Sequence, residues 1–126
     1  MELRPLSRVG QVLLADDDKT LRLLLAQIIT AFGFDVSQAE NGRKALELFD
    51  QADGGFDLLV TDICMPEMDG SELIHAIRMR NQQLPIIVVT GFAEPDLIAD
   101  VESCNAKLFV KPLDFKALQA HIDSLR

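Results

Sequence analysis

The sequence lacks the features that mark disulfide-stabilised, secreted and membrane-spanning proteins. Two cysteines in 126 residues are too few for a disulfide framework, so we expect both to be free thiols. No apolar run approaches the ~18 residues of a membrane-spanning helix, and residues 1–10 lack the apolar core of a signal peptide. We therefore expect a cytoplasmic protein of one domain, without membrane contact.

Basic residues are also scarce, and this limits the possible partners. Twelve Lys and Arg residues stand against twenty Asp and Glu residues, which gives a formal net charge of −8 at pH 7. Nucleic acids and anionic lipids favour Lys and Arg, so this balance argues against nonspecific binding to either. An acidic protein is better suited to bind a metal ion or a basic patch on another protein.

The sequence does contain five short apolar runs, and each pair is separated by enough residues for one helix. The runs are Val12–Ala15, Phe34–Val36 with Ala39, Leu58–Thr61, Ile86–Val89 and Leu108–Val110. This alternation predicts an α/β domain in which parallel strands are joined by helical crossovers. We expect the runs that are apolar throughout to be central, buried strands.

The segments between these runs carry helical spacing and helix-terminus signals. The clearest apolar stripe consists of Leu21, Leu24, Leu25, Ile28, Ile29 and Phe32, and Gly33 ends it. The residues expected to begin the later helices are Asn41-Gly42, Ser71, Pro95 and Asp114.

Polar side chains follow four of the five predicted strands. They are Asp16-Asp17-Asp18 after the first, Asp62 after the third, Thr90 after the fourth and Lys111 after the fifth. A single aspartate in such a place is more often a turn cap than part of a site. Because the carboxyl ends of parallel strands open onto one crevice, however, we expect all of these groups to converge.

The chemistry of such a cluster follows from its charges. Neighbouring carboxylates repel one another unless a cation relieves them, and carboxylates with a loop carbonyl and waters suit Mg²⁺, which readily shares phosphate ligands. With Mg²⁺ and the Lys111 ammonium beside it, Asp62 could attack a phosphoryl group in line and form an aspartyl phosphate. Thr90 would offer its hydroxyl to the phosphoryl oxygens.

These residues resemble the receiver domain of two-component response regulators. The resemblance spans residues 10–125 and rests on the acidic pair Asp16-Asp17, the segment Asp62–Gly70 (Asp-Ile-Cys-Met-Pro-Glu-Met-Asp-Gly), Thr90 and Lys111-Pro112. It implies a flavodoxin-like, doubly wound (βα)5 sandwich, with a parallel sheet of order 2-1-3-4-5 and helices on both faces. A short arm over residues 1–10 would precede the receiver domain over residues 11–126.

The resemblance also implies residue roles and partners. Asp62 would accept the phosphoryl group from a sensor histidine kinase or histidine phosphotransfer domain, assisted by Thr90 and Lys111. The implied ligands of Mg²⁺ are the side chains of Asp16, Asp17 and Asp62 and the backbone carbonyl of Cys64. The peptide bond before Pro112 would be cis. The protein would be a signalling switch in a phosphorelay, not an enzyme beyond its own phosphorylation and dephosphorylation.

Phosphorylation would then remodel the face made by the fourth helix, fifth strand and fifth helix, which would control an output partner or domain other than nucleic acid. The protein would be a monomer or a weak homodimer.

Two positions depart from the family pattern. Leu108 replaces the switch aromatic, and its neighbour Phe109 should point to the other face, so we expect weaker or differently built coupling. Phe92 replaces a polar residue that would position water, and we hypothesise that it shields the acyl phosphate.

Other residues and interpretations carry less weight. His75 and His121 lie on helical segments without a further partner, so neither is expected to be a phosphodonor or a base.

The segment Asp16–Thr20 also fits the motif of haloacid dehalogenase-like phosphatases, but the further acidic pair of those enzymes is absent. A receiver-like binding module that works without phosphorylation is kept open by Leu108 and disfavoured by the otherwise intact site.

Overall fold

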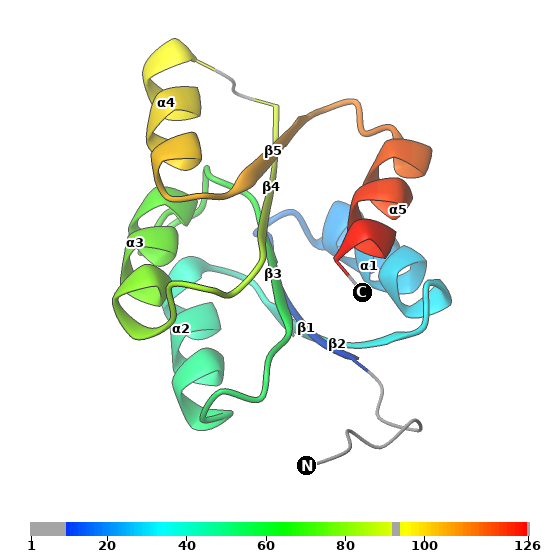
Figure 1. Ribbon diagram of the computed structural model, residues 1–126, viewed down its shortest axis with the longest axis horizontal. Helices are drawn as coiled ribbons and strands as arrows, with labels where there is room; N and C mark the ends of the chain where they lie inside the picture. Colours follow the sequence, from blue (N-terminus) through cyan, green and yellow to red (C-terminus); the bar gives the residue numbers. More distant parts are fainter. Residues whose placement is uncertain (1–9, 92–93, 126) are drawn as a thin grey trace.

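Five parallel strands form one sheet with α-helices on both of its faces (Figure 1). The computed structural model describes residues 10–91 and 94–125. The strands are β1 (Gly10–Ala15), β2 (Phe34–Ala39), β3 (Leu58–Thr61), β4 (Ile86–Thr90) and β5 (Lys107–Val110), in the order β2-β1-β3-β4-β5. The helices are α1 (Lys19–Ala31), α2 (Gly42–Gln51), α3 (Gly70–Arg80), α4 (Pro95–Ser103) and α5 (Phe115–Ser124). The predicted fold class and strand order are confirmed.

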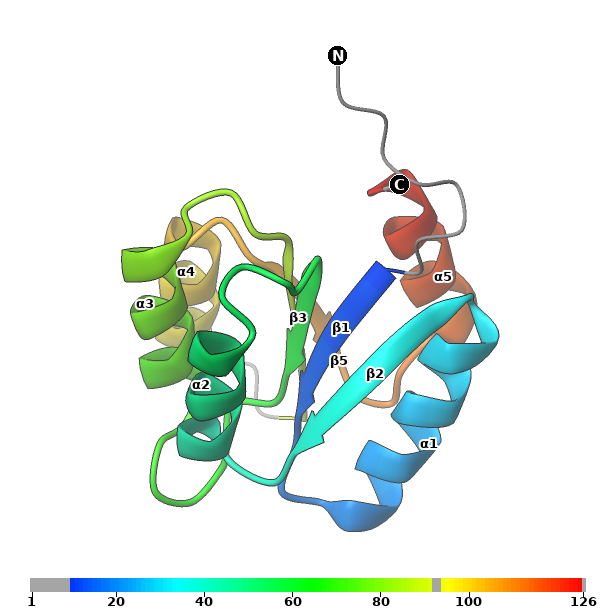
Figure 2. The ribbon, with the colours of Figure 1, turned by 90° about the horizontal axis from the view of Figure 1, so that it is seen from below.

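The apolar runs form the core as predicted. β3 and β4 are buried over their whole length, as is β1 from Val12 onward, and these three strands lie at the centre of the sheet. Helices α2, α3 and α4 cover one face of the sheet, and α1 and α5 cover the other (Figure 2). Because successive side chains of a strand alternate between faces, Leu13 belongs to the core cluster on the first face and Leu14 to the cluster on the second. The same alternation separates Leu108 from Phe109, which pack on opposite faces of the sheet, as expected.

Aspartate and asparagine side chains begin most of the helices. The carboxylate of Asp18 caps α1, the amide oxygen of Asn41 caps α2, and the carboxylate of Asp114 caps α5, each accepting a backbone N–H of the first turn. Pro95 occupies the first turn of α4, as predicted. The prediction for α3 is wrong, because Asp69 caps that helix by accepting the Glu72 N–H at 2.9 Å.

Other expectations concern single bonds and segments. The Lys111–Pro112 peptide bond is cis, and both cysteines are free, Cys64 exposed and Cys104 half-buried. Among the described residues, no helix combines the length and apolarity needed to cross a bilayer. Apart from Gly10, which belongs to β1, the arm expected over residues 1–10 lies outside the described residues, as does Phe92.

One arginine holds the end of α3 to two neighbouring segments. The Arg78 guanidinium donates hydrogen bonds to the backbone carbonyls of Cys104 and Leu84, both at 2.7 Å, of Asn81 at 3.1 Å, and of Asn105 at 3.2 Å. Burial lowers the pKa of Arg78 below its usual value. The contacts fix the start of β4 and the end of α4 against α3.

We predict that Arg78→Leu lowers the free energy of unfolding by about 2 kcal/mol, because it leaves partly buried carbonyls without a charged donor. Urea denaturation followed by circular dichroism measures the change. The matched control is Arg43→Leu, which removes an exposed ion pair with Glu47 and should change stability by less than about 0.5 kcal/mol. Equal effects of the two substitutions would contradict the structural role of Arg78.

Candidate functional site

The carboxyl ends of the strands bring the predicted polar residues to one edge of the sheet. Asp16 directly follows β1, Asp62 directly follows β3, Thr90 is the last residue of β4 and Lys111 directly follows β5. Carboxylate oxygens of Asp16, Asp17 and Asp62 all lie within 4.8 Å of one another. The predicted convergence of the acidic residues is therefore present.

The Asp62 carboxylate is held from both of its oxygens. Oδ1 accepts the backbone N–H of Ile63 at 2.6 Å, and Oδ2 lies 3.2 Å from the Lys111 ammonium. The Asp62 N–H donates to the Ala15 carbonyl at 2.9 Å, which ties the end of β3 to that of β1. The side chain of Asp62 is only 9% exposed, so the Lys111 ammonium is a close countercharge that little water screens.

Asp16 is the most deeply buried acid of the cluster. The residue is 1% exposed, and burial raises the pKa of Asp16 to about 6. The Asp18 N–H, at 2.9 Å from Oδ1, and Lys111 lower this pKa, whereas the nearby Asp62 and Asp17 raise it further. A divalent cation with oxygen ligands would relieve this repulsion, so the donor set fits Mg²⁺.

The other predicted site residues lie around this cluster. Thr90 is 1% exposed, and its carbonyl accepts the Lys111 N–H at 2.9 Å. Cys64 lies two residues beyond Asp62 in the following loop with its side chain exposed. In the described part of the structure, no contact of the Cys64 carbonyl bears on its role as a ligand of Mg²⁺, so that role stays a prediction.

Two features of the site were not predicted from the sequence. A Cβ at Gly70 would collide with the Asp62 carbonyl, and the Gly70 N–H donates to the Ile63 carbonyl at 2.8 Å, so the glycine lets the loop close over the end of β3. The Arg22 guanidinium donates to the Asp16 carbonyl at 2.8 Å and braces the acidic segment from α1. Gly70 belongs to the segment that carries the family resemblance, but its contact with Asp62 cannot be inferred from the sequence, and no sequence signal marks Arg22.

The histidines differ from expectation in one case. The prediction that neither has a further partner is wrong for His75, whose Nε2 lies 3.1 Å from Asp100 Oδ1 and whose ring lies beside Cys104 Sγ. His121 stacks edge-on against Phe109, with ring centroids 5.9 Å apart. Neither residue belongs to the acidic cluster.

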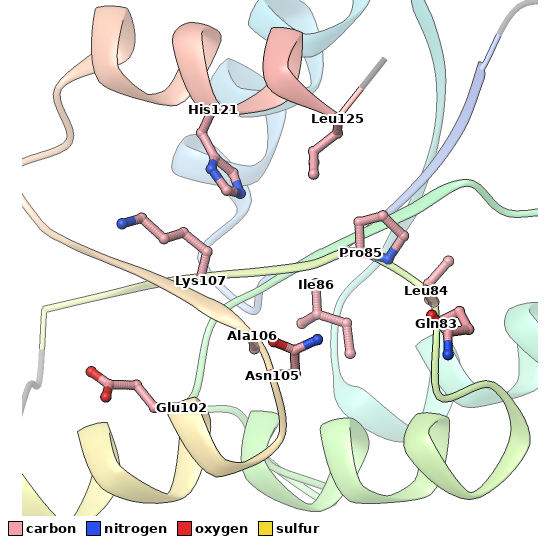
Figure 3. A pocket seen from close by; sticks show the side chains of 10 residues that line it. All are labelled: Gln83, Leu84, Pro85, Ile86, Glu102, Asn105, Ala106, Lys107, His121 and Leu125. Carbon is pink, nitrogen blue, oxygen red and sulfur yellow. The ribbon is translucent and has the colours of Figure 1, made fainter.

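A cavity of about 520 Å³ opens elsewhere on the molecule, at the amino ends of β4 and β5 (Figure 3). Pro85, Lys107, His121 and Leu125 are among its lining residues. The carboxyl ends of the strands, where Asp16 and Asp62 lie, are at the other edge of the sheet. The cavity is therefore separate from the acidic site.

Known proteins share this fold and sequence pattern. The profile of the response regulator receiver domain matches residues 12–123. The chain is 38% identical over 115 residues to the sensor protein EvgS of Escherichia coli (strain K12), covering 90% of this chain and 9% of EvgS. It is 35% identical over 116 residues to the response regulator receiver protein CpdR of Brucella abortus (strain 2308), covering 91% of this chain and 95% of CpdR.

A solved structure agrees with these sequence matches. The CheX–CheY–BeF3–Mg²⁺ complex from Borrelia burgdorferi superposes with a TM-score of 0.85 at 27% identity, covering 92% of this chain and 88% of that chain. The chain therefore belongs to the response regulator receiver domain family of two-component systems. Some relatives are far longer than the matched region and others, such as CpdR, are nearly coextensive with it.

The pKa of Asp16 generates a prediction about stability. Because the pKa is raised from 3.8 to about 6, the folded protein without metal binds this proton more tightly than the unfolded chain, and its stability falls as the pH rises through that interval. We predict that Asp16→Asn, which removes this charge, stabilises the metal-free protein at pH 8 by about 1 kcal/mol, or about 4 °C in Tm.

Thermal unfolding in a chelator at pH 4 and pH 8 measures this effect, which should shrink at the lower pH. The control is Asp35→Asn at an exposed position, expected to change stability by less than about 0.5 kcal/mol at either pH. A destabilised Asp16→Asn protein at pH 8 would contradict the unrelieved charge.

Proposed function

We propose that this domain is the phosphoacceptor of a two-component phosphorelay, with Asp62 as the acceptor. The observation that carries the proposal is the buried Asp62 carboxylate, held beside two further acids and 3.2 Å from the Lys111 ammonium. A phosphorylation-independent binding module would not need this arrangement. A haloacid dehalogenase-like phosphatase is also disfavoured, because Asp18 caps α1 and lies outside the three-acid cluster.

The chain's own residues define the reaction. An Asp62 carboxylate oxygen attacks phosphorus and forms an O–P bond, while the bond between phosphorus and the donor nitrogen breaks and its electron pair stays with the donor histidine. The Lys111 ammonium, already beside Oδ2, offsets negative charge on the phosphoryl oxygens. The Thr90 hydroxyl donates to one of these oxygens after transfer.

Mg²⁺, held by the side chains of Asp16, Asp17 and Asp62 and the Cys64 carbonyl, would supply the remaining charge neutralisation. The CheY protein in the Borrelia burgdorferi complex is named with both BeF3 and Mg²⁺, and this supports the assignment by analogy. The relief of the Asp16 charge by the ion also links metal binding to stability, since the pKa of Asp16 is raised by burial and by its acidic neighbours.

The proposed output is a change in the face formed by α4, β5 and α5. Thr90 pairs in register with Val110 of β5, so movement of Thr90 toward a phosphoryl group would be transmitted directly to that strand. Leu108 points into the core beneath α2, α3 and α4 and has no flat ring to turn inward. Coupling through displacement of the strand is therefore favoured over rotation of a side chain at this position.

We propose two kinds of partner. The phosphoryl donor is a sensor histidine kinase or a histidine phosphotransfer domain, and the output partner is a protein or domain that binds the face formed by α4, β5 and α5. The similarity to EvgS, named as a sensor protein, supports a kinase as donor, and the similarity to CpdR, named as a response regulator receiver protein, supports a role in passing the signal on. Because the chain spans 9% of EvgS, the partners of the whole protein are part of this proposal. A cytoplasmic location is also part of this proposal.

We predict that Lys111→Ala still forms a Mg²⁺-dependent beryllofluoride complex but loses most of the response of the output face, because the ammonium that bridges β5 to the acceptor is gone. Amide chemical shifts of α4, β5 and α5, recorded by NMR with and without beryllofluoride, measure the response. The matched control is Lys107→Ala, which removes an exposed lysine at the opposite end of β5 from Lys111 and should respond as the wild type does. A full response in Lys111→Ala would refute the proposed coupling, and no complex in the wild type would refute the proposed function.

A further inference from the structure

Three side chains of different metal-binding chemistry meet on the surface between α3 and α4. His75 comes from α3, Asp100 comes from α4, and Cys104 is the residue that ends α4. One ligand atom from each lies within 4.8 Å of the other two. The cluster shares no residue with the acidic site around Asp62.

The spacings of the His75 nitrogens from the other two ligand atoms are close to those of a tetrahedral site. His75 Nε2 lies 3.1 Å from Asp100 Oδ1, and Cys104 Sγ lies 3.7 and 3.8 Å from the two ring nitrogens of His75. Zinc bonds of about 2.0 to 2.3 Å at tetrahedral angles separate ligand atoms by about 3.3 to 3.7 Å. Small side-chain rotations would therefore suffice to admit an ion.

A neighbouring hydroxyl group orients the Asp100 carboxylate in a way that suits a metal ligand. The Ser71 hydroxyl donates to Asp100 Oδ2 at 2.7 Å and leaves Oδ1 facing His75. A partner of this kind, which orients a ligating carboxylate through its second oxygen, is a common feature of protein metal sites. It also gives Ser71 a role other than the helix cap expected from the sequence.

The frame of the cluster is held independently of any ion. Asp100 and Cys104 are four residues apart, one helical turn, so their side chains share the face of α4 that looks toward α3. Arg78 on α3 donates to the Cys104 and Asn105 carbonyls and fixes the end of α4 in place. The side chains of His75 and Asp100 are 56% and 37% exposed, so an ion can reach them from solvent.

We propose that His75, Asp100 and Cys104 form a binding site for a divalent transition-metal ion of the zinc class, with solvent as the remaining ligand. Nitrogen, sulfur and oxygen donors together suit Zn²⁺ or Co²⁺, whereas the all-oxygen set at Asp16, Asp17 and Asp62 suits Mg²⁺. The two sites therefore differ in the ions they select. An ion at the new site bridges α3 to α4, a helix of the proposed output face.

Cobalt titration in excess Mg²⁺ tests the site, because Mg²⁺ competes for the acidic cluster and only the new site contains sulfur. The wild type should gain a sulfur-to-cobalt charge-transfer absorption that saturates at one Co²⁺ per chain and disappears when Zn²⁺ is added. Cys104→Ser should abolish the band. His75→Ala and Asp100→Asn should weaken Co²⁺ binding by more than about 10-fold, and Ser71→Ala by about 10-fold.

Matched controls use the remaining cysteine and histidine. Cys64→Ser and His121→Ala should both keep the band and its affinity, and thermal unfolding in a chelator should show that every variant is folded. The proposal is wrong if the wild type shows no band, if the band survives Cys104→Ser or is lost in Cys64→Ser, or if His75→Ala and Asp100→Asn bind Co²⁺ as the wild type does. None of these outcomes bears on phosphorylation of Asp62, which is measured separately.

Discussion

Two carboxylates, those of Asp16 and Asp62, are buried side by side at the carboxyl end of the sheet, and their charges govern what the site can bind. The Lys111 ammonium lies 3.2 Å from Asp62 Oδ2. Burial raises the pKa of Asp16 to about 6, although Lys111 lowers it in part. A cation among these oxygens would relieve the charge that burial leaves on Asp16.

The fold holds these charges in place through its backbone. The parallel sheet aligns the carboxyl ends of β1 and β3, and the Ile63 N–H fixes one oxygen of Asp62. The Asp69 cap and the absence of a side chain at Gly70 let α3 begin directly against the end of β3. The strands beneath the site, β3 and β4, are buried and, apart from their terminal residues Thr61 and Thr90, apolar, so the core can support the buried charges above it.

The sequence was sufficient to predict the sheet and the members of the acidic site because both depend on local patterns. Apolar runs of strand length and polar residues at their ends can be recognised without knowing any long-range contact. The start of α3 was mispredicted because Ser71 and Asp69 can both cap a helix, and the fold sets Asp69 at the cap while Ser71 bonds to Asp100. The contacts of His75 with Asp100 and of Arg78 with Cys104 could not be predicted, since each pair is more than twenty residues apart in sequence and meets only through the packing of α3 on α4.

Acceptance of a phosphoryl group by Asp62 can be measured as the intact mass of the protein after incubation with acetyl phosphate. Wild-type protein should gain one phosphoryl group in the presence of Mg²⁺ and none in a chelator. Asp62→Asn should gain none in either condition, while thermal unfolding shows that it is folded. An equal adduct on Asp62→Asn, or an adduct that forms without Mg²⁺, would contradict the account of this site.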